Sequence, residues 1–373
     1  MPRKRTIAIV TGSRADFGLL VPVIQAVRAN KALRLRVIAT GTHLSLGTWR
    51  DVARTVDIDA KVRMQTKAAV GRDADVAALG RGITGLGRAI TDLRPHVVLV
   101  LGDRIEALAA GCAASVGGVH LAHIHGGDRA EGVADEAIRH AVSKLAHLHF
   151  AACRSSAERL KRMGEHADAV FNVGSPAIDG LADIESADDA LLQDRGLDPV
   201  RPYVIIMQHP IGEPDAQEKA WMAATLAATR GEQRIVMTPN GDPGTRGIMA
   251  AIRAAKVRPV THLPRGEFLR LLKRAEALVG NSSAGLIEAA ALRASGVPVV
   301  NVGPRQAGRD KPANVIDCGY GEGSVREALR QAVNAQRAST RHPFGDGRAG
   351  ERIARTLATI DLAQVPIRKR NAY

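Results

Sequence analysis

The sequence has few aromatic and few sulfur-containing side chains: 5 Phe, 3 Tyr, 2 Trp, 7 Met and 3 Cys among 373 residues. With so few rings, a stacking platform for single-stranded nucleic acid is hard to assemble. The core must instead be built from Ala, Val, Leu and Ile. The cysteines, Cys112, Cys153 and Cys318, stand at no metal-binding or redox spacing, which favours the reduced thiols of an intracellular protein.

Long apolar runs are also missing. No run approaches the ~20 residues of a membrane-spanning helix, and the apolar segment 6–10 is too short for the core of a signal peptide. Hydrophobic residues make up 45% of the chain and charged residues 24%, a globular balance that excludes wholesale disorder. We expect a soluble, cytoplasmic protein without a membrane partner, long enough for two domains.

The charge is strongly positive, with 52 Lys and Arg against 38 Asp and Glu, a net charge of +14. Such an excess suits an anionic partner: a nucleic acid, an acidic surface or a phosphorylated metabolite. Basic residues gather at 2–5 and 368–370, and the others are scattered through segments with the pattern of solvated helix faces. This distribution favours surface solubility, and we expect no nucleic-acid partner.

Short apolar, β-branched runs alternate with helix-patterned stretches, an order typical of parallel βαβ units. The predicted helices include 19–29, 105–116 and 135–146. The predicted strands are 6–11, 35–40, 97–101, 120–125 and 147–152, followed by 203–207, 234–238, 277–279 and 297–302. Strand patterning is weak across 174–202. We predict two doubly wound Rossmann-like domains, 1–180 and 181–373, with the last helix packing back on the first domain.

Ligands of open parallel sheets bind beyond the carboxyl ends of the strands. Polar residues crowd six such strand-end loops, divided between the two predicted domains. The loops are 11–16, 102–104, 123–128, 208–210, 238–240 and 280–285. We therefore expect one active site in the cleft between the domains.

The loop 280–285, Gly-Asn-Ser-Ser-Ala-Gly, follows a predicted strand and opens a predicted helix through 286–293. Small residues admit an anion to backbone N–H groups, hydroxyls add donors and the helix dipole favours negative charge. Plain N-capping is the alternative. The loop is neither a Walker motif nor a dinucleotide fingerprint. Glu288, inside that helix, is either a ligand of both ribose hydroxyls or an exposed helix glutamate.

Charged residues also follow the early strands. Arg14, in the first strand-to-helix loop, could pair with a phosphate. Asp103 stands at a strand tip, where the neighbouring Arg104 could hold it ionised, and a purely structural ion pair is the alternative. His123, His125 and the stretch 128–140 add many titratable groups. A metal site would need both histidines on one face plus a third ligand, so acid–base chemistry is favoured and no metal is predicted.

Six motifs in family order together resemble the hydrolysing UDP-N-acetylglucosamine 2-epimerases of the sialic-acid type. They are Thr-Gly-Ser-Arg-Ala-Asp-Phe-Gly (11–18), Leu-Gly-Asp-Arg (101–104), His-Ile-His-Gly-Gly-Asp (123–128), Asp-Glu-Ala-Ile-Arg-His (135–140), Gly-Asn-Ser-Ser-Ala-Gly-Leu-Ile-Glu (280–288) and Gly-Pro-Arg-Gln-Ala-Gly-Arg (303–309). The resemblance implies a GT-B-like fold with UDP held mainly by the second domain. It also implies a homodimer or a dimer of dimers, and no cofactor.

The resemblance also implies site residues. Asp103, Asp135 and His209 match catalytic positions, and His125 stands where many relatives have a glutamate. Whether His125 is an acid, a base or a hydrogen-bond donor stays open. The residues expected to bind substrate are Arg14, Arg104, Asp128, Asn240, Ser282, Ser283, Glu288 and Arg309. Of these, the two serines match diphosphate contacts, Glu288 a ribose contact, and Arg14 and Arg309 phosphate contacts.

The implied reaction converts UDP-N-acetylglucosamine and water to N-acetylmannosamine and UDP, by anti elimination to a glycal and then hydration. It would feed the biosynthesis of sialic-acid-type sugars. One alternative is the same chemistry on UDP-2,4-diacetamido-2,4,6-trideoxyglucose, for legionaminic-type sugars. Others are epimerisation without hydrolysis, which the forms of the motifs at 14–16 and 281–283 disfavour, and a glycosyltransferase or sugar-nucleotide sensor, against which the retained Asp103 counts.

Overall fold

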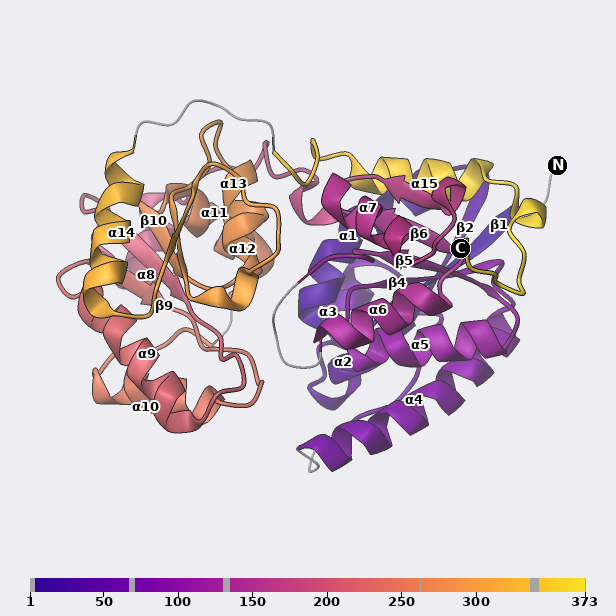
Figure 1. Ribbon diagram of the computed structural model, residues 1–373, viewed down its shortest axis with the longest axis horizontal. Helices are drawn as coiled ribbons and strands as arrows, with labels where there is room; N and C mark the ends of the chain where they lie inside the picture. Colours follow the sequence, from indigo (N-terminus) through magenta and orange to yellow (C-terminus); the bar gives the residue numbers. More distant parts are fainter. Residues whose placement is uncertain (1–3, 67–70, 130–134, 262, 336–341, 373) are drawn as a thin grey trace. The chain divides into compact units, whose positions relative to one another are not determined.

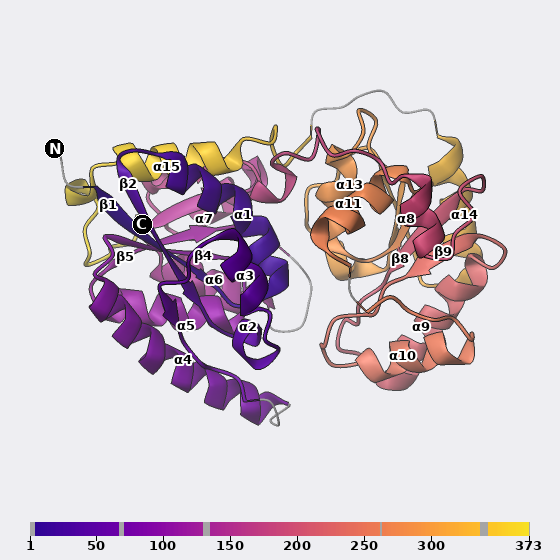
Figure 2. The same cartoon turned by 180° about the vertical axis from the view of Figure 1, so that it is seen from behind.

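The computed structural model describes residues 4–66, 71–129, 135–261, 263–335 and 342–372. The chain folds as two compact units: Met1–Asp128, Ala134–Asp179 and Phe344–Tyr373 form the first, and Arg129–Val133 and Gly180–Pro343 form the second. Each unit holds one parallel sheet covered by helices, as Figures 1 and 2 show from opposite sides. The prediction of two doubly wound, Rossmann-like sheets is confirmed.

The first unit is built on a seven-stranded sheet in the order β3-β2-β1-β4-β5-β6-β7. Its strands are β1 (Arg5–Thr11), β2 (Leu33–Ala39), β3 (Ala60–Lys61), β4 (Val97–Leu101), β5 (His120–Ile124), β6 (Leu148–Ala151) and β7 (Val170–Asn172). The strand β1 pairs with β2 on one side and β4 on the other, so the strand order reverses there. Ligands of such sheets bind at this reversal, beyond the carboxyl ends of the strands.

Helices cover both faces of this sheet, because alternate residues of its strands are buried on opposite sides. Ile7 and Ile9 of β1 pack in one core cluster with residues of α1 and α15, whereas Ala8 and Val10 pack with α4 and α5 on the other face. The helices are α1 (Arg14–Ala29), α2 (Thr42–Ser45), α3 (Trp49–Thr55), α4 (Arg72–Leu93), α5 (Ile105–Val116), α6 (Asp135–Leu145), α7 (Arg154–Arg162) and α15 (Ala349–Thr359).

The end of the chain belongs to the first unit, where α15 packs against α1. Asp179 caps α15, because its carboxylate accepts hydrogen bonds from the backbone amides of Ala349 (2.9 Å) and Gly350 (2.6 Å). At Gly350 a Cβ atom would lie 2.8 Å from the carbonyl oxygen of Pro22, so only glycine lets the two helices approach this closely.

A buried carboxylate ties the last residues to the sheet. Glu165, 2% exposed, lies 2.8 Å from Lys144 Nζ, 2.8 Å from His149 Nε2 and 2.5 Å from Lys369 Nζ. Burial raises the pKa of this carboxyl, but the hydrogen bonds from His149, Lys144 and Lys369 outweigh it and bring the pKa down to about 2. The C-terminal segment is therefore part of the folded first unit.

The second unit holds a five-stranded parallel sheet in the order β12-β11-β10-β8-β9. Its strands are β8 (Tyr203–Met207), β9 (Gln233–Val236), β10 (Ala277–Gly280), β11 (Val299–Val302) and β12 (Val315–Cys318). Its helices are α8 (Asp189–Asp194), α9 (Asp215–Ala228), α10 (Thr245–Ala254), α11 (Arg265–Arg274), α12 (Ser283–Leu286), α13 (Glu288–Ala291) and α14 (Glu322–Asn334). The core cluster joins β8, β10 and β11 to α9, α10 and α14.

All nine predicted strands are present, with ends shifted by at most two residues, and β3, β7 and β12 are additional. The predicted helix 19–29 begins earlier, at Arg14, because Ser13 and Asp16 form a capping box ahead of the apolar face. No helix within the described ranges is long and apolar enough to cross a membrane.

Candidate functional site

Asp103 lies in the turn between β4 and α5, at the carboxyl edge of the first sheet. Its carboxylate forms an ion pair with Arg139 of α6, whose side chain is 4% exposed, against 22% for Asp103. Arg139 Nη1 also donates to the backbone carbonyl of Asp128 (3.1 Å). Arg139 therefore joins the tips of β4 and β5, a role that its place in the sequence did not reveal. The neighbouring Arg104 Nε lies 3.4 Å from Glu106.

His125 follows β5 with a left-handed backbone (φ 64°) and is 8% exposed. Its Nδ1 lies 2.8 Å from Asp128 Oδ2, and its Nε2 lies 2.9 Å from the hydroxyl of Ser175. Asp128 Oδ1 accepts a further hydrogen bond from Ser156 (2.7 Å). A carboxylate acceptor keeps a proton on Nδ1, and Ser175 is the residue that meets the other ring nitrogen. Ser175 was not predicted, because it lies 50 residues from His125 in the sequence.

His123 and His125 do not share a metal site, since each ring has different partners. His123 Nε2 lies 2.7 Å from the carbonyl oxygen of Gly102, and its Nδ1 lies 3.1 Å from Ser143 Oγ. Burial lowers the pKa of His123 to about 3, so the ring is neutral. Its contact with the Gly102 carbonyl holds the backbone next to Asp103. Within the described ranges, no group of three His, Cys, Asp or Glu side chains is placed to hold a metal ion.

Arg14 and Asp135 are two other predicted site residues of the first unit. Arg14, at the start of α1, is paired with Asp51 of α3, with Nε and Nη2 at 2.8 and 2.6 Å from one carboxylate oxygen. The Arg14 side chain is 43% exposed, so a phosphate would have to compete with Asp51 for a solvated guanidinium. Asp135 begins α6, and its side chain lies outside the described residues.

The predicted phosphate loop follows β10 in the second unit. At Gly280 (φ 138°) a Cβ atom would lie 2.1 Å from the carbonyl oxygen of Met207, so the loop leaves the sheet pressed against the end of β8. Ser282 caps α12, its hydroxyl accepting from the amide of Ala284 (3.4 Å). Ser282 is therefore an N-cap, which was the alternative to a phosphate contact in the sequence analysis. Ser283 is the first residue of α12.

The single helix predicted through 286–293 is wrong. The segment forms two one-turn helices, α12 and α13, separated at Ile287. At the junction Ile287 has φ −100° and ψ −68°, and its carbonyl accepts from His342 Nε2 (2.9 Å). The Ala289 carbonyl accepts from the Val297 amide (2.8 Å), which lies beyond both helices. Because a one-turn helix has little dipole, we do not expect a helix dipole to contribute to phosphate binding here.

Glu288 is buried, with 7% exposure, and its carboxylate lies 3.1 Å from Arg265 Nη1. The alternative of an exposed helix glutamate is therefore wrong. Arg265, at the start of α11, is a partner that the sequence did not indicate. The Arg265 side chain is 31% exposed, and its contact holds one oxygen of the buried Glu288 carboxylate.

His209 follows β8 and is held by two asparagines. Asn281 accepts from the His209 amide (2.7 Å) and donates to its carbonyl (2.8 Å), while the Asn240 amide donates to His209 Nδ1 (3.1 Å). The Asn240 side chain itself donates to Asp242. Burial, and then the charge of Arg305, lower the pKa of His209 to about 3. The second unit thus brings His209, Asn240 and the phosphate loop together.

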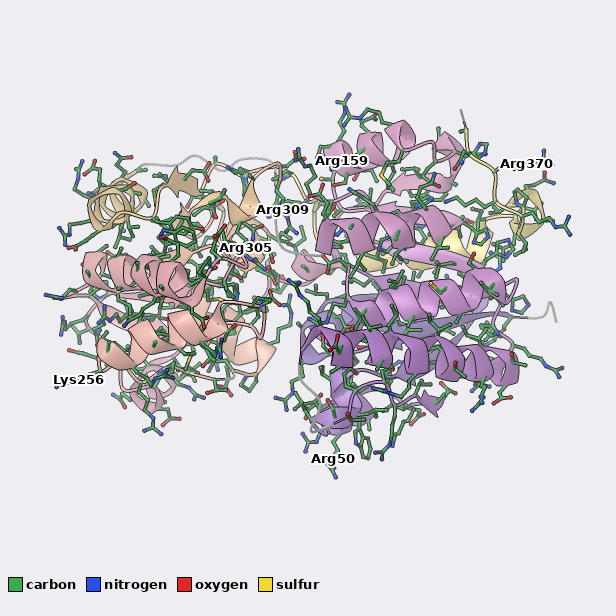
Figure 3. The ribbon with its side chains drawn as sticks, turned by 60° about the horizontal axis from the view of Figure 1, so that its bottom comes forward. Arg50, Arg159, Lys256, Arg305, Arg309 and Arg370 are labelled. Carbon is green, nitrogen blue, oxygen red and sulfur yellow. The ribbon has the colours of Figure 1, made fainter. Side chains whose placement is uncertain are left out.

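Two arginines follow β11, and both are labelled in Figure 3. Arg305 Nη1 donates to the carbonyl of Asn281 (3.3 Å), which places it beside the phosphate loop. Arg309 Nε donates to the carbonyl of Arg129 (2.5 Å). Arg305 was part of a recognised motif but was not predicted as a site residue, although its contact with the loop is direct.

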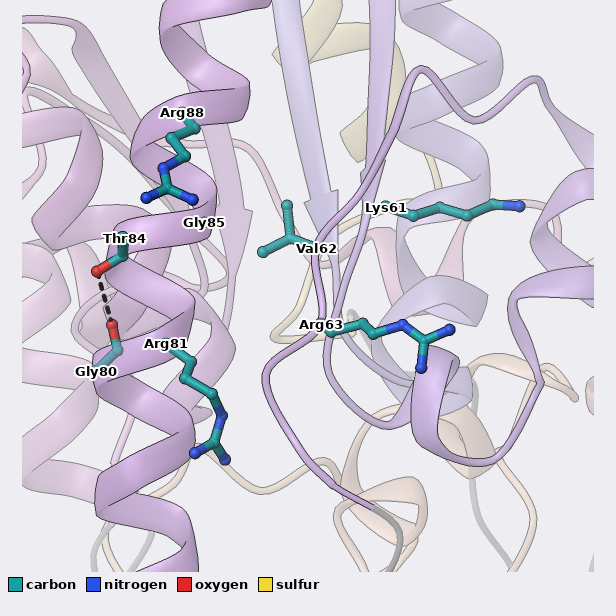
Figure 4. A pocket seen from close by; sticks show the side chains of 8 residues that line it. All are labelled: Lys61, Val62, Arg63, Gly80, Arg81, Thr84, Gly85 and Arg88. Atoms are coloured by element: carbon teal, nitrogen blue, oxygen red, sulfur yellow. Dashed lines mark hydrogen bonds between the residues drawn. The ribbon is translucent and has the colours of Figure 1, made fainter.

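A separate hollow of about 570 Å³ lies in the first unit, between α4 and the segment after β3 (Figure 4). Its lining residues are Lys61, Val62, Arg63, Gly80, Arg81, Thr84, Gly85 and Arg88. In Figure 4, Lys61 and Arg63 point away from α4, and Lys61 Nζ lies 3.4 Å from the centroid of the Trp49 ring. The basic groups do not converge on one point, and no predicted site residue lines this hollow.

Comparisons with known proteins agree with the motifs. The family model described as UDP-N-acetylglucosamine 2-epimerase matches residues 25–358. The chain is 35% identical, over 99% of its length and 100% of the relative's, to a hydrolysing UDP-N,N'-diacetylbacillosamine 2-epimerase of Legionella pneumophila. It is 32% identical, over 98% of each chain, to a UDP-N-acetylglucosamine 2-epimerase of Neisseria meningitidis.

The fold is also similar to that of a solved structure. A crystal structure of UDP-GlcNAc 2-epimerase from Neisseria meningitidis bound to UDP-GlcNAc superposes with a TM-score of 0.78 at 19% identity, covering 94% of this chain and 99% of that one. Two Rossmann-like units with this likeness define a GT-B-like protein. The chain belongs to the UDP-N-acetylglucosamine 2-epimerase family and is a UDP-sugar 2-epimerase. The six motifs therefore indicated the right family, and membership of the UDP-N-acetylglucosamine 2-epimerase family is confirmed.

Proposed function

We propose that this enzyme is the hydrolysing kind of 2-epimerase, which converts UDP-N-acetylglucosamine and water to N-acetylmannosamine and UDP. The observation that carries the proposal is the cluster at the strand ends of the first unit. There Arg139 contacts both Asp103 and the backbone of Asp128, and Asp128 in turn orients His125. Proton-transfer groups gathered in this way suit a reaction that must both remove and return a proton.

The chemistry divides between the units. In the elimination step a base of the first unit takes the C2 proton, the C2–H electrons form the C1–C2 double bond, and the C1–O bond breaks with its electrons on UDP. Water then adds its oxygen to C1, and a proton returns to C2 on the opposite face. Asp103, His125 and Asp135 are the candidates for these transfers.

The leaving diphosphate needs donors and positive charge. In the second unit, Ser282, Ser283 and Arg309 are the proposed contacts of the diphosphate, and Glu288, fixed by Arg265, that of the ribose. Arg14 of the first unit would join the diphosphate in exchange for Asp51. Asn240, Arg104 and Asp128 complete the proposed substrate contacts. As the family resemblance implies, we extend the proposal to a cytoplasmic homodimer or dimer of dimers that works without a cofactor.

A second substrate is favoured by one observation. The 35% identical Legionella pneumophila relative acts, by its name, on UDP-N,N'-diacetylbacillosamine and is hydrolysing. The second candidate is therefore the same reaction on UDP-2,4-diacetamido-2,4,6-trideoxyglucose, with a 4-acetamido and a 6-deoxy group on the sugar.

The test is to incubate the protein separately with both UDP-sugars and to identify the products by NMR, with Asp103→Asn as the matched inactive control. Free UDP together with a free mannosamine-type sugar supports the proposal, and the faster substrate decides between the two candidates. A UDP-sugar epimer that keeps its UDP would show the non-hydrolysing reaction instead. Turnover of neither substrate would contradict both proposals.

A further inference from the structure

The ring of His209 has one nitrogen whose protonation is set by the backbone. The Asn240 amide donates a hydrogen bond to His209 Nδ1 over 3.1 Å. A backbone amide can only donate, so Nδ1 must be the bare, accepting nitrogen. In a neutral ring the proton then belongs to Nε2. Within the described residues, Nε2 has no hydrogen-bond partner, so its N–H is available to a ligand at the end of β8.

Asn281 holds the residue that carries this ring. Its side chain is 1% exposed, accepts from the His209 amide (2.7 Å) and donates to the His209 carbonyl (2.8 Å). Only an amide of this length can accept and donate in this way, because a carboxylate lacks the donor and an aliphatic side chain lacks both. The Asn281 backbone is fixed in turn, since its carbonyl accepts from Gln306 Nε2 (2.8 Å).

The charges around the ring disfavour an imidazolium. The Arg305 guanidinium, which donates to the Asn281 carbonyl at 3.3 Å, is the charged group that acts on His209. Burial and this cation both lower the pKa of His209, to about 3. An imidazolium would also turn Nδ1–H against the Asn240 amide proton. The geometry and the charges therefore select the same ring, neutral with its proton on Nε2.

We propose that His209 acts on the substrate only as a neutral hydrogen-bond donor through Nε2, towards an anionic oxygen of the nucleotide-sugar, and that Asn281 is the positioning residue for this donor. The inference rests on the proposed function for the identity of the ligand, and it removes His209 from the proton-transfer steps. A neutral donor can stabilise developing negative charge without changing its protonation state during the reaction. The proton transfers then belong to the residues of the first unit.

The tautomer is measured in the unliganded protein, so this arm does not depend on the reaction. The chain has 12 histidines, and the ¹⁵N signals of His209 are those that a His209→Gln variant lacks. We expect Nδ1 to have the shift of a bare nitrogen and Nε2 that of a protonated one, unchanged from about pH 5 to 8. A proton on Nδ1, or titration near pH 6.5, would overturn the proposal.

Two substitutions test the donor during turnover. The amide nitrogen of Gln can occupy the place of Nε2, whereas that of Asn lies near Nδ1. We expect His209→Gln to lose less than about tenfold in kcat and His209→Asn to lose about 10²- to 10³-fold, the usual effect of removing one such donor. Equal, severe losses in both variants would show that His209 transfers a proton. If wild type turns over neither UDP-sugar, the proposed function fails while the NMR result still stands.

Asn281→Asp keeps the acceptor for the His209 amide but removes the donor to its carbonyl. We expect the His209 ¹⁵N signals to shift towards a mixture of tautomers and kcat to fall with them. Asn314→Asp is the matched control: Asn314 is also buried (2% exposed) in the second unit and donates to the Val297 carbonyl at 2.7 Å. It should lose stability but leave the His209 signals in place. Equal shifts in both variants, or none in Asn281→Asp, would refute the positioning role.

Discussion

Replacing Asp103 by Asn separates chemistry from stability, because the structure pairs Asp103 with a buried cation. The Arg139 side chain is 4% exposed, and the substitution leaves its charge without the Asp103 carboxylate. Breaking a fully buried pair costs roughly 3–5 kcal/mol. Since the Asp103 side chain is 22% exposed, we expect the lower end, about 3 kcal/mol, or a fall in Tm of about 6–12 °C.

Turnover should fall much further than stability alone explains. Loss of a general acid–base group usually costs about 10²- to 10⁴-fold, and we expect Asp103→Asn to lie in that range. UDP affinity should stay close to wild type, because Asp103 is not among the proposed nucleotide contacts, which apart from Arg14 lie in the second unit. The assays are UDP release for turnover, calorimetric titration for UDP binding and thermal unfolding for stability.

The control is Asp103→Asn combined with Arg139→Met, which removes both charges and replaces the guanidinium with an apolar chain of similar length. Because Arg139→Met removes the charge that Asp103→Asn leaves buried and unpaired, the double variant should melt above Asp103→Asn yet stay inactive. If Asp103→Asn kept turnover within about tenfold of wild type, the catalytic role would be refuted. If the double variant melted no higher than the single one, the ion-pair reasoning would be wrong.

Three further predictions concern binding and pH. Ser283→Ala and Arg309→Ala should mainly raise KM, the second more strongly because it removes a charge-assisted contact, and an unchanged KM in both would show that the nucleotide lies elsewhere. UDP at about 100 times its Kd should stabilise the protein by about 2.7 kcal/mol with EDTA present, because the proposed diphosphate contacts are protein groups, and stabilisation that appears only with added metal would contradict this. The Glu165 pKa of about 2 lies below the unfolded value of 4.5, so the stability from this carboxylate is complete above about pH 4.5 and is lost as the pH falls towards 2. Glu165→Gln should flatten that part of the stability profile measured by urea unfolding, and an unaltered slope would show that other carboxyls cause it.

The strands and the strand-end loops could be predicted because each depends on residues close together in the sequence. Apolar runs such as 97–101 and 203–207 are buried on both faces, and both strands are found with the predicted bounds. The prediction of one helix at 286–293 was wrong, and there the carbonyls of Ile287 and Ala289 accept hydrogen bonds from His342 and Val297, contacts that no local sequence pattern indicates.

The partners of the site residues were not predicted from the sequence. Asp51, Arg139, Ser175 and Arg265 each pair with a predicted residue 23 to 50 positions away in the sequence. No local sequence pattern predicts such a pair, because only the packing of separate elements brings the two side chains together. For Arg139 the sequence shows only its place among the titratable residues 135–140, whereas its burial and its carboxylate partner are known from the structure.

The central claim is that hydrolysis proceeds by elimination of UDP and hydration of the resulting glycal. It is tested most directly by running the reaction in D₂O containing ¹⁸O-labelled water and analysing both products by NMR and mass spectrometry. The mechanism predicts one solvent deuterium at C2 of the released sugar and the ¹⁸O at its C1, with no label in the UDP. Protium retained at C2, or ¹⁸O in the phosphate of UDP, would contradict the account and indicate direct hydrolysis instead.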